Sequence, residues 1–242
     1  RMGTGRSLVK EPLIQCRDLG RTYQKGSVQI MPLRDVELEI GDGEFISLMG
    51  PSGSGKTTLL NILAGIDRPT TGELRVDGVD VTKLSGRRLA DWRAANIGYI
   101  FQLYNLIPVL SAYENIETPL LLKNLTRKQR HEAVSTAMAR TGITDRADHY
   151  PRQLSGGQEQ RVAIARAIVS SPRILVADEP TGDLDSRSAR DVLALIRRLN
   201  IDLGMTIIMV THDEEIASLA DRTVHLLDGQ ITDSPEKTGA VA

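Results

Sequence analysis

The sequence predicts an α/β fold whose core is a parallel β-sheet. Two short apolar runs, Ile174 to Ala177 and Thr206 to Val210, have the length and continuity of strands buried on both faces. Between them, apolar residues recur at helical spacing, which predicts an amphipathic crossover helix over Ser186 to Leu203. A third observation, a glycine-rich loop between a strand and a helix, places a similar unit nearer the N-terminus.

The first part of the chain is expected to be β-structure. Leu13 to Leu19, Val36 to Ile40 and Glu44 to Met49 are short runs rich in strand-forming residues. Asp42 and Gly43 lie between the last two runs and are typical turn residues, so these two strands are expected to form a hairpin. The predicted fold therefore includes an N-terminal antiparallel β subdomain.

A glycine-rich loop follows the third strand and leads into a helix expected over Lys56 to Ala64. Gly50 to Thr57 match the phosphate-loop pattern G-x-x-x-x-G-K-[ST]. Glycines leave room for backbone N–H groups to approach a polyanion, and the helix adds its positive N-terminal end. The alternative, a glycine-rich turn with an exposed lysine, is disfavoured by the flanking strand and helix. The predicted phosphate-binding residues are Gly50, Pro51, Ser52, Gly53, Ser54, Gly55, Lys56, Thr57 and Thr58.

Two acidic residues complete this predicted nucleotide site. Lys56 would place a charge at the β- and γ-phosphates, and Thr57 would offer a hydroxyl to Mg²⁺. Asp178 ends an apolar strand and is expected to be the second magnesium anchor. Its neighbour Glu179 would polarise the attacking water as a general base. Two solvated acids at a strand end are the alternative, which the phosphate loop makes less favoured.

The composition between these motifs shifts to helix formers and charged residues, which predicts an inserted helical lobe over about 103–170. Helices are expected over Glu114 to Leu122, Arg127 to Thr141 and Arg161 to Val169, with Pro119 as punctuation.

Leu154 to Gln158 read Leu-Ser-Gly-Gly-Gln just before the last of these helices. Ser155, Gly156 and Gly157 could bring a hydroxyl, bare amides and a helix dipole to a phosphate. The same residues would equally well form a helix N-cap and a glycine turn, and the local sequence leaves both interpretations open.

Composition excludes several classes of protein. The 242 residues, 40% of them hydrophobic, suit one globular domain, expected over 11–235. The net charge of -1 gives no overall field for nucleic acid, and Cys16 as the only cysteine excludes an internal disulfide and favours a reducing, cytoplasmic compartment. No apolar run approaches the roughly 18 residues of a spanning helix. Residues 1–10 are expected to be a disordered extension or cloning remnant, and 236–242 a polar tail.

From about Leu13 to Ile231 the chain resembles the ATP-binding cassette (ABC) ATPases, through the phosphate loop, the two acids and the Leu-Ser-Gly-Gly-Gln run. The resemblance implies a P-loop NTPase with a RecA-like parallel-sheet core, an antiparallel β subdomain and an inserted α-helical subdomain, which binds ATP and Mg²⁺. Leu-Ser-Gly-Gly-Gln is similar to the family signature, which contacts the γ-phosphate held by a second subunit. A head-to-tail homodimer is therefore implied, with Ser155, Gly156, Gly157 and Gln158 of one chain at the nucleotide of the other.

The resemblance also implies roles for four further residues. Tyr23 is similar to the A-loop aromatic residue that stacks on adenine, although a core tyrosine at a strand end would look the same. Gln102 matches the Q-loop glutamine that touches magnesium and links core to lobe, and His212 matches the switch histidine at the γ-phosphate. Asp185 matches the D-loop aspartate at the dimer interface and could also cap a helix. Glu159 departs from the family, in which many members carry a second glutamine after the signature.

Three stretches, Ala64 to Gly72, Phe101 to Pro108 and Pro180 to Asp185, most resemble the lipoprotein-release, macrolide-exporter and cell-division ATPases. Such proteins use ATP-driven dimer closure to move a separate membrane subunit, which implies a cytoplasmic protein peripheral on the inner face of the cell membrane. The apolar residues within Gln102 to Leu110 are expected either to contact this integral membrane subunit or to pin the helical lobe to the core.

The main alternative is a soluble ATPase of the same superfamily that acts on DNA or ribosomes. Chromosome and repair members carry a long coiled coil between the two motifs, and translation factors carry two cassettes, whereas this chain has one cassette and a short lobe. A P-loop kinase or GTPase has no reason for Leu-Ser-Gly-Gly-Gln, and no Asn-Lys-x-Asp motif occurs. No nucleic-acid partner is therefore expected.

Overall fold

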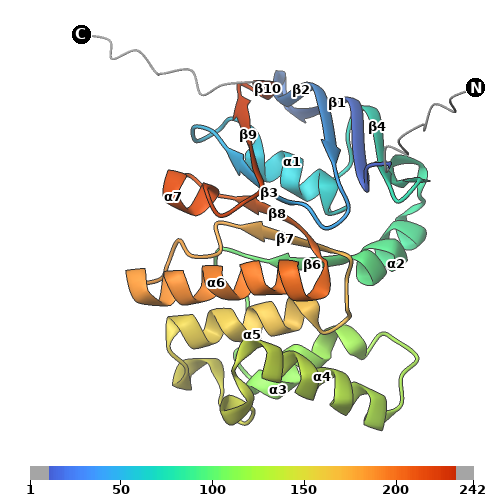
Figure 1. Ribbon diagram of the computed structural model, residues 1–242. Helices are drawn as coiled ribbons and strands as arrows, with labels where there is room; N and C mark the ends of the chain where they lie inside the picture. Colours follow the sequence, from blue (N-terminus) through green and yellow to red (C-terminus); the bar gives the residue numbers. More distant parts are fainter. Residues whose placement is uncertain (1–10, 233–242) are drawn as a thin grey trace, which may run out of the picture.

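The computed structural model describes residues 11–232, and within this range two β-sheets lie above a group of helices (Figure 1). The expected extension 1–10 and tail 236–242 lie outside the described residues. The strands are β1 (Ile14–Lys25), β2 (Val28–Ile40), β3 (Phe45–Met49), β4 (Thr71–Val76), β5 (Val79–Asp80), β6 (Ile97–Ile100), β7 (Ile174–Asp178), β8 (Thr206–Val210), β9 (Arg222–Leu227) and β10 (Gln230–Thr232). The α-helices are α1 (Lys56–Leu63), α2 (Gly86–Asn96), α3 (Ala112–Glu117), α4 (Arg127–Thr141), α5 (Gly156–Ile168), α6 (Ser186–Leu203) and α7 (Glu214–Ala217).

The larger sheet carries the site and has the strand order β10-β9-β3-β8-β7-β6. All of its neighbouring strands run parallel except β10, which pairs antiparallel with β9. Every residue of β3 and β8 is buried, as expected for central strands covered on both faces. The predicted parallel core is confirmed, and its carboxyl edge brings the ends of β3, β7 and β8 together.

The smaller sheet, β2-β1-β4-β5, is antiparallel and confirms the predicted β subdomain. The expected hairpin across Asp42 and Gly43 is wrong, because β2 and β3 belong to different sheets. The amide of Gly43 donates to the Thr206 hydroxyl at 2.8 Å, so the turn directs β3 alongside β8. The physical reason is burial: every residue of β3 is buried, whereas β2 has exposed positions along its length and suits a sheet with one exposed face.

Helix α1 lies between the two sheets, α5 and α6 cover the opposite face of the larger sheet, and α3 and α4 pack on α5 farther from the sheet (Figure 1). Two clusters of buried side chains correspond to these layers: one joins α1 to both sheets, and the other joins α3 to α6 to the larger sheet. The loop before α1 is therefore held on a helix that is packed from both sides.

The helices within 103–170 differ in part from the sequence expectation. The helix expected over Glu114 to Leu122 ends at Glu117, where a 3₁₀ turn, Thr118–Leu120, replaces it, because Pro119 has no N–H to continue the α-helical ladder. The helix expected from Arg161 instead starts at Gly156 as α5. Helices α4 and α6 have their predicted bounds.

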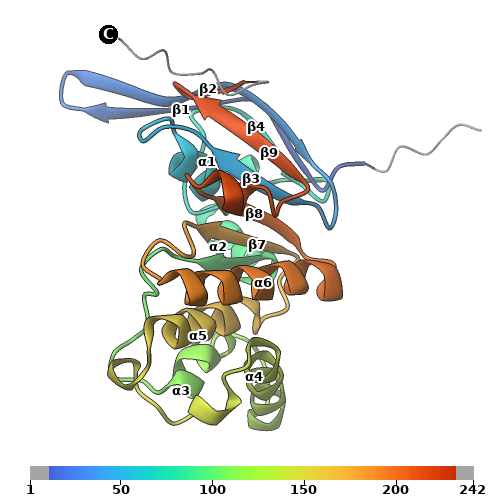
Figure 2. The same ribbon diagram turned by 60° about the vertical axis from the view of Figure 1, so that its left-hand side comes forward.

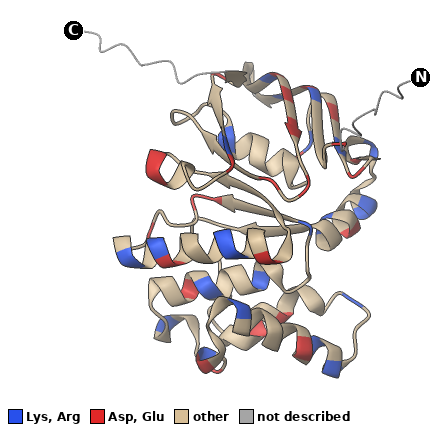
Figure 3. Cartoon of the chain, in the orientation of Figure 1, with Lys and Arg blue, Asp and Glu red and all other residues tan. Residues whose placement is uncertain are grey.

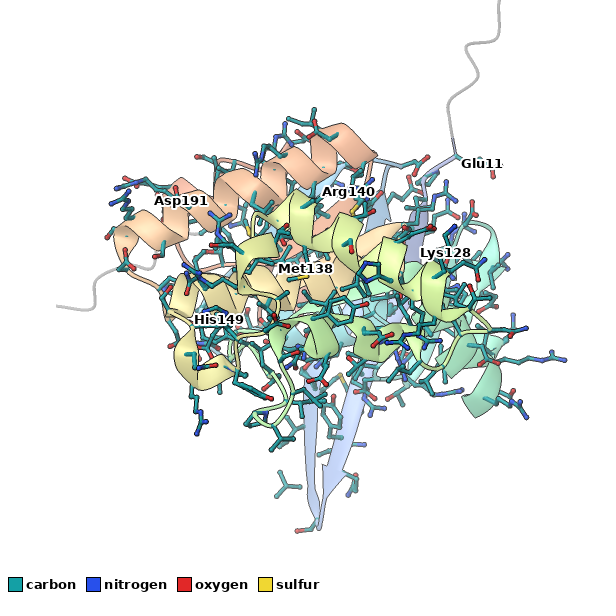
Figure 4. All side chains as sticks on the ribbon, turned by 90° about the horizontal axis from the view of Figure 1, so that it is seen from below. Glu11, Lys128, Met138, Arg140, His149 and Asp191 are labelled. Carbon is teal, nitrogen blue, oxygen red and sulfur yellow. The ribbon has the colours of Figure 1, made fainter. Side chains whose placement is uncertain are left out.

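The hairpin of β1 and β2 projects beyond the rest of the fold (Figures 2 and 4). On the helices, basic and acidic side chains are interspersed along α4 and α6 (Figure 3). Among the described residues, no helix is both long enough and apolar enough to span a membrane.

Candidate functional site

A cavity of about 360 Å³ opens where the loop before α1 meets the ends of β7 and β8. It brings the predicted phosphate loop together with the predicted base and switch histidine, which lie far apart in the sequence. Its lining residues are Pro32, Gly50, Ser52, Gly53, Gly55, Lys56, Thr57, Thr58, Glu179, Val210 and His212. Pro32 and Val210 were not expected here, and nothing in their local sequence marks them.

The phosphate loop has a backbone that only glycine can adopt at two positions. Gly50 has φ 147°, and a Cβ there would lie 2.1 Å from the Leu226 carbonyl oxygen. Gly55 has φ 104°, and its Cβ would lie 2.3 Å from the carbonyl oxygen of Pro32. Ser54 between them is buried, and its hydroxyl has no hydrogen-bond partner within the described part of the chain. The loop is thus a tight cradle with free polar groups.

Lys56 is held inside this cradle. Its ammonium donates to the carbonyl oxygens of Gly50 and Pro51, both at 2.8 Å. Burial lowers the pKa of Lys56, and the negative charges of Glu179 and Asp178 oppose this shift. The ammonium therefore curls over its own loop and faces the two acids.

Asp178 ends β7 beside this lysine. Burial raises the pKa of its carboxyl group, as does the charge of Glu179, while a hydrogen bond with Thr57 and the charge of Lys56 lower it. The Thr57 hydroxyl and the Asp178 carboxylate thus adjoin and form a pair of hard oxygen donors at the end of β7.

Glu179 and His212 face each other across the cavity. The Nδ1 atom of His212 lies 3.2 Å from Oε1 of Glu179. The amide of Glu179 donates to the carbonyl of Val210, which ties the ends of β7 and β8 together. Glu179 has φ 45°, a left-handed conformation rare for residues other than glycine.

The Leu-Ser-Gly-Gly-Gln run does not line this cavity. Ser155 is the N-cap of α5: its hydroxyl accepts from the Gln158 amide, and the Gln158 side chain accepts from the Ser155 amide. The N-cap interpretation is therefore realised within the single chain. Ser155 is exposed, and Gly156 and Gly157 are half-buried, with the hydroxyls of Tyr104 and Ser188 close to where their Cβ atoms would lie.

Gln102 and Asp185 also lie outside the cavity lining. Gln102 is exposed, with its amide nitrogen against Gly182 in the loop that follows Glu179. Asp185 caps α6, where its carboxylate accepts from the amides of Arg187 and Ser188. Hydrogen bonds from the hydroxyl and from the amide of Ser188 lower the pKa of Asp185, and the hydroxyl has the larger effect.

Tyr23 lies on β1, with 38% of the residue exposed. It is not a core tyrosine, which was the alternative for this position. Its hydroxyl donates to Oδ2 of Asp67 at 2.5 Å, and the guanidinium of Arg21 lies 4.3 Å from the ring centroid. Arg21 and Asp67 were not identified from the sequence, because their partners come together only in the fold.

Comparison with known proteins agrees with this geometry. Residues 33–182 match the family model described as ABC transporter. The chain is 42% identical over 219 residues to the ABC transporter ATP-binding protein YvrO of Bacillus subtilis strain 168, covering 90% of this chain and 95% of YvrO. It is 46% identical over 231 residues to the macrolide export ATP-binding/permease protein MacB 1/2 of Paracoccus denitrificans, covering 96% of this chain. The chain spans 34% of the length of that larger protein.

Solved structures show the same likeness. MJ0796, described as a bacterial ABC transporter cassette of dimeric structure, superposes with a TM-score of 0.83 at 41% identity, covering 90% of this chain and 96% of MJ0796. CbiO1 of Clostridium perfringens, part of an ABC transporter complex, gives 0.83 at 28% identity, covering 92% of this chain and 88% of CbiO1. The chain therefore belongs to the ABC transporter family, as one of its ATP-binding cassettes.

Proposed function

We propose that this ABC ATPase works as a pair of copies that sandwich two ATP molecules and drive a membrane-embedded partner. The observation that supports this best is the division of the phosphate-binding features. The phosphate loop, Glu179 and His212 share one cavity, whereas the signature residues lie outside it, at the N-terminus of α5. A second copy would supply the missing half of each site.

The cradle before α1 would hold the β- and γ-phosphates. Its backbone amides and the Lys56 ammonium offer positive charge, and the buried Ser54 hydroxyl has an unused hydrogen-bonding capacity within the described residues. The adjoining oxygens of Thr57 and Asp178 fit Mg²⁺, and Gln102 would be a third ligand. When bound, the ion would neutralise charge on the phosphate oxygens. Tyr23 would stack on adenine.

Glu179 would take a proton from the attacking water, whose oxygen then bonds to the γ-phosphorus as the bond to the bridging oxygen of ADP breaks. His212, 3.2 Å from Glu179, would steady the base and donate to the γ-phosphate. Tightly held oxygens and an oriented water are most of what such a transfer requires of a protein.

The partner copy would contribute Ser155, Gly156, Gly157 and Gln158 to each nucleotide. The amide end of α5 carries a partial positive charge, and a γ-phosphate placed there would complete the cap. Asp185 would lie at the same interface. ATP would then bridge the two copies, so that ATP binding closes the dimer. Hydrolysis would remove the bridge and allow the dimer to open.

A membrane-embedded partner would dock near the loop that follows Gln102. Leu103 and Val109 are 67% and 78% exposed and would contact the partner, whereas Leu106 packs on the helical core. Beside it a largely apolar groove of about 560 Å³ includes Ile66, Phe101 and Leu122, the last 92% exposed. Through this partner the ATPase would sit on the inner face of the cell membrane.

The substitution Glu179→Gln tests the proposed chemistry. It removes the base but keeps the shape of the side chain, so ATP hydrolysis should fall by about a hundredfold or more. ATP binding should persist, and the unhydrolysed ATP should hold two copies together as a dimer during size-exclusion chromatography. Glu132→Gln on the exposed face of α4 is the control. Hydrolysis at the normal rate by Glu179→Gln would show that another group is the base.

A further inference from the structure

Three side chains outside the phosphate cavity, those of Arg21, Tyr23 and Asp67, form a cluster in which each contacts the other two. Nη2 of Arg21 is 2.8 Å from Oδ1 of Asp67, and the hydroxyl of Tyr23 donates to the other carboxylate oxygen at 2.5 Å. The guanidinium of Arg21 also lies over the ring of Tyr23, 4.3 Å from its centroid. One carboxylate thus holds both the hydroxyl of the tyrosine and the cation that covers one of its ring faces.

This cluster is only partly open to water. The side chains of Arg21 and Asp67 are 21% and 25% exposed. Nε of Arg21 is buried and has no hydrogen-bond partner within residues 11–232. An ion pair orients a partly buried guanidinium more strongly than one on the surface, because less water competes for it. Asp67 therefore holds the guanidinium of Arg21 in place.

The segment that carries Asp67 is anchored to the helix of the phosphate loop. The amides of Ile66 and Asp67 both donate to the carbonyl of Asn61 in α1, at 2.8 and 3.1 Å. Further along, Thr70 exchanges hydrogen bonds with β1 at Gly20 and Thr22. Because α1 starts directly after the phosphate loop, Asp67 is tied to the same helix that carries this loop.

The register of the β1–β2 hairpin places Tyr23 next to the cavity. Tyr23 pairs with Ile30, two residues before Pro32 on β2, and Pro32 lines the cavity. The pairing shifts between Arg21 and Tyr23, so the strand ladder does not by itself fix the tyrosine. Because the β1–β2 hairpin projects beyond the rest of the fold (Figure 2), the position of the Tyr23 ring depends on the contacts of its side chain with Arg21 and Asp67.

We propose that Arg21 and Asp67 are positioning residues that hold the Tyr23 ring as a platform for the nucleotide base, with the base stacking on the ring face opposite Arg21. The inference rests on the proposed role of Tyr23 and adds how that role is achieved. A preordered ring avoids the entropy cost of fixing a side chain when the base arrives. The pair should therefore affect affinity for the base and leave the phosphate site unchanged.

The test measures the dissociation constants of Mg-ATP and of magnesium tripolyphosphate, which lacks the base, in the full-length protein. Arg21→Ala and Asp67→Ala should each weaken ATP binding about threefold to tenfold and leave tripolyphosphate binding unchanged. Tyr23→Ala should weaken ATP binding at least as much, by about tenfold. Combining Asp67→Ala with Tyr23→Ala should add little, because both remove the same platform.

Glu117→Gln is the matched control, because Glu117 pairs with Arg130 at 2.8 Å and the two side chains are 20% and 24% exposed. It should change neither constant. Equal losses for ATP and tripolyphosphate in Asp67→Ala would mean a general structural role and overturn the inference. If Tyr23→Ala weakens ATP while Arg21→Ala and Asp67→Ala do not, the platform needs no positioning and the inference is wrong. An unchanged ATP affinity in Tyr23→Ala would instead reject the proposed role of the tyrosine itself, and the inference with it.

Discussion

At the scale of single residues, the cavity is set by backbone geometry as much as by side-chain chemistry. The motif predicts that glycines are needed around a phosphate, but not which contact forbids a side chain. In the fold, Gly50 approaches the end of β9 so closely that a Cβ would lie 2.1 Å from the Leu226 carbonyl oxygen. The phosphate loop therefore depends on a strand more than 170 positions away in the sequence, and no local pattern could have revealed this.

The substitution Gly50→Ala should reduce both stability and ATP binding. The clash with backbone and the φ of 147° together should cost about 2 kcal/mol or more of unfolding free energy. Gly78→Ala is the control, because Gly78 has φ 74° in a turn with open space around its Cβ position, so only the conformational cost of about 1 kcal/mol applies. Thermal unfolding and ATP titration measure the two effects. If Gly50→Ala were no worse than Gly78→Ala, the close approach to β9 would have no consequence.

At the scale of elements, the sequence predicted best where one periodicity dominates. The helix over Ser186–Leu203 and the strand Thr206–Val210 have their predicted bounds, because a strong apolar stripe and an uninterrupted apolar run leave little ambiguity. The prediction of a hairpin at Asp42 was wrong because turn residues specify a turn but not the sheet that the next strand joins. The strands β9 and β10 were not recognised, since Arg222–Leu227 mixes charged and polar residues with a few apolar ones and is a strand through its pairing with β3 and β10.

Asp221, at the start of β9, should make stability depend on acid pH. Burial raises the pKa of its carboxyl group, but hydrogen bonds from the Phe45 amide and the Arg197 guanidinium outweigh this and lower the pKa below 3.8. A lowered carboxyl pKa stabilises the fold above the unfolded value and loses this effect as pH falls through the folded value.

Asp221→Asn should therefore reduce unfolding free energy at pH 7 by only about 0.5 kcal/mol, because the Asp221 side chain is 42% exposed and solvent screens its ion pair, and the difference from the unsubstituted protein should shrink as pH falls below 3.8. Chemical denaturation across this range measures it. Asp191→Asn, at an exposed position of α6, is the control and should match the unsubstituted protein throughout. A difference that does not change with pH would contradict the role of the carboxylate charge.

At the scale of the whole molecule, the site is incomplete in one chain. The sequence predicted nearly every lining residue of the phosphate cavity from its motifs, because the phosphate loop and the strand-end acids are local patterns. Two interpretations of Ser155 to Gly157 stayed open, and the fold shows the capping role within the single chain, with these residues outside the phosphate cavity. The cap and the proposed contact with a second copy are compatible, since the cap uses one amide of α5 and leaves others free.

Two inactive variants that rescue each other would test this division most directly. Lys56→Ala disables the phosphate loop, and Ser155→Asp keeps an N-cap residue but places a negative charge where the partner's γ-phosphate would lie. Ser155→Asn, which caps without charge, is the control. Each of the two variants alone should lack ATP hydrolysis, because both sites of its dimer carry the defect.

The decisive measurement is the ATP hydrolysis rate of an equimolar mixture of Lys56→Ala and Ser155→Asp chains. If each site combines the phosphate loop of one copy with the signature of the other, every mixed dimer has one intact site. The mixture should then recover about a quarter of the unsubstituted rate, since half of randomly paired dimers are mixed. If the signature served the nucleotide of its own chain, no intact site would form and the mixture would remain as inactive as its components.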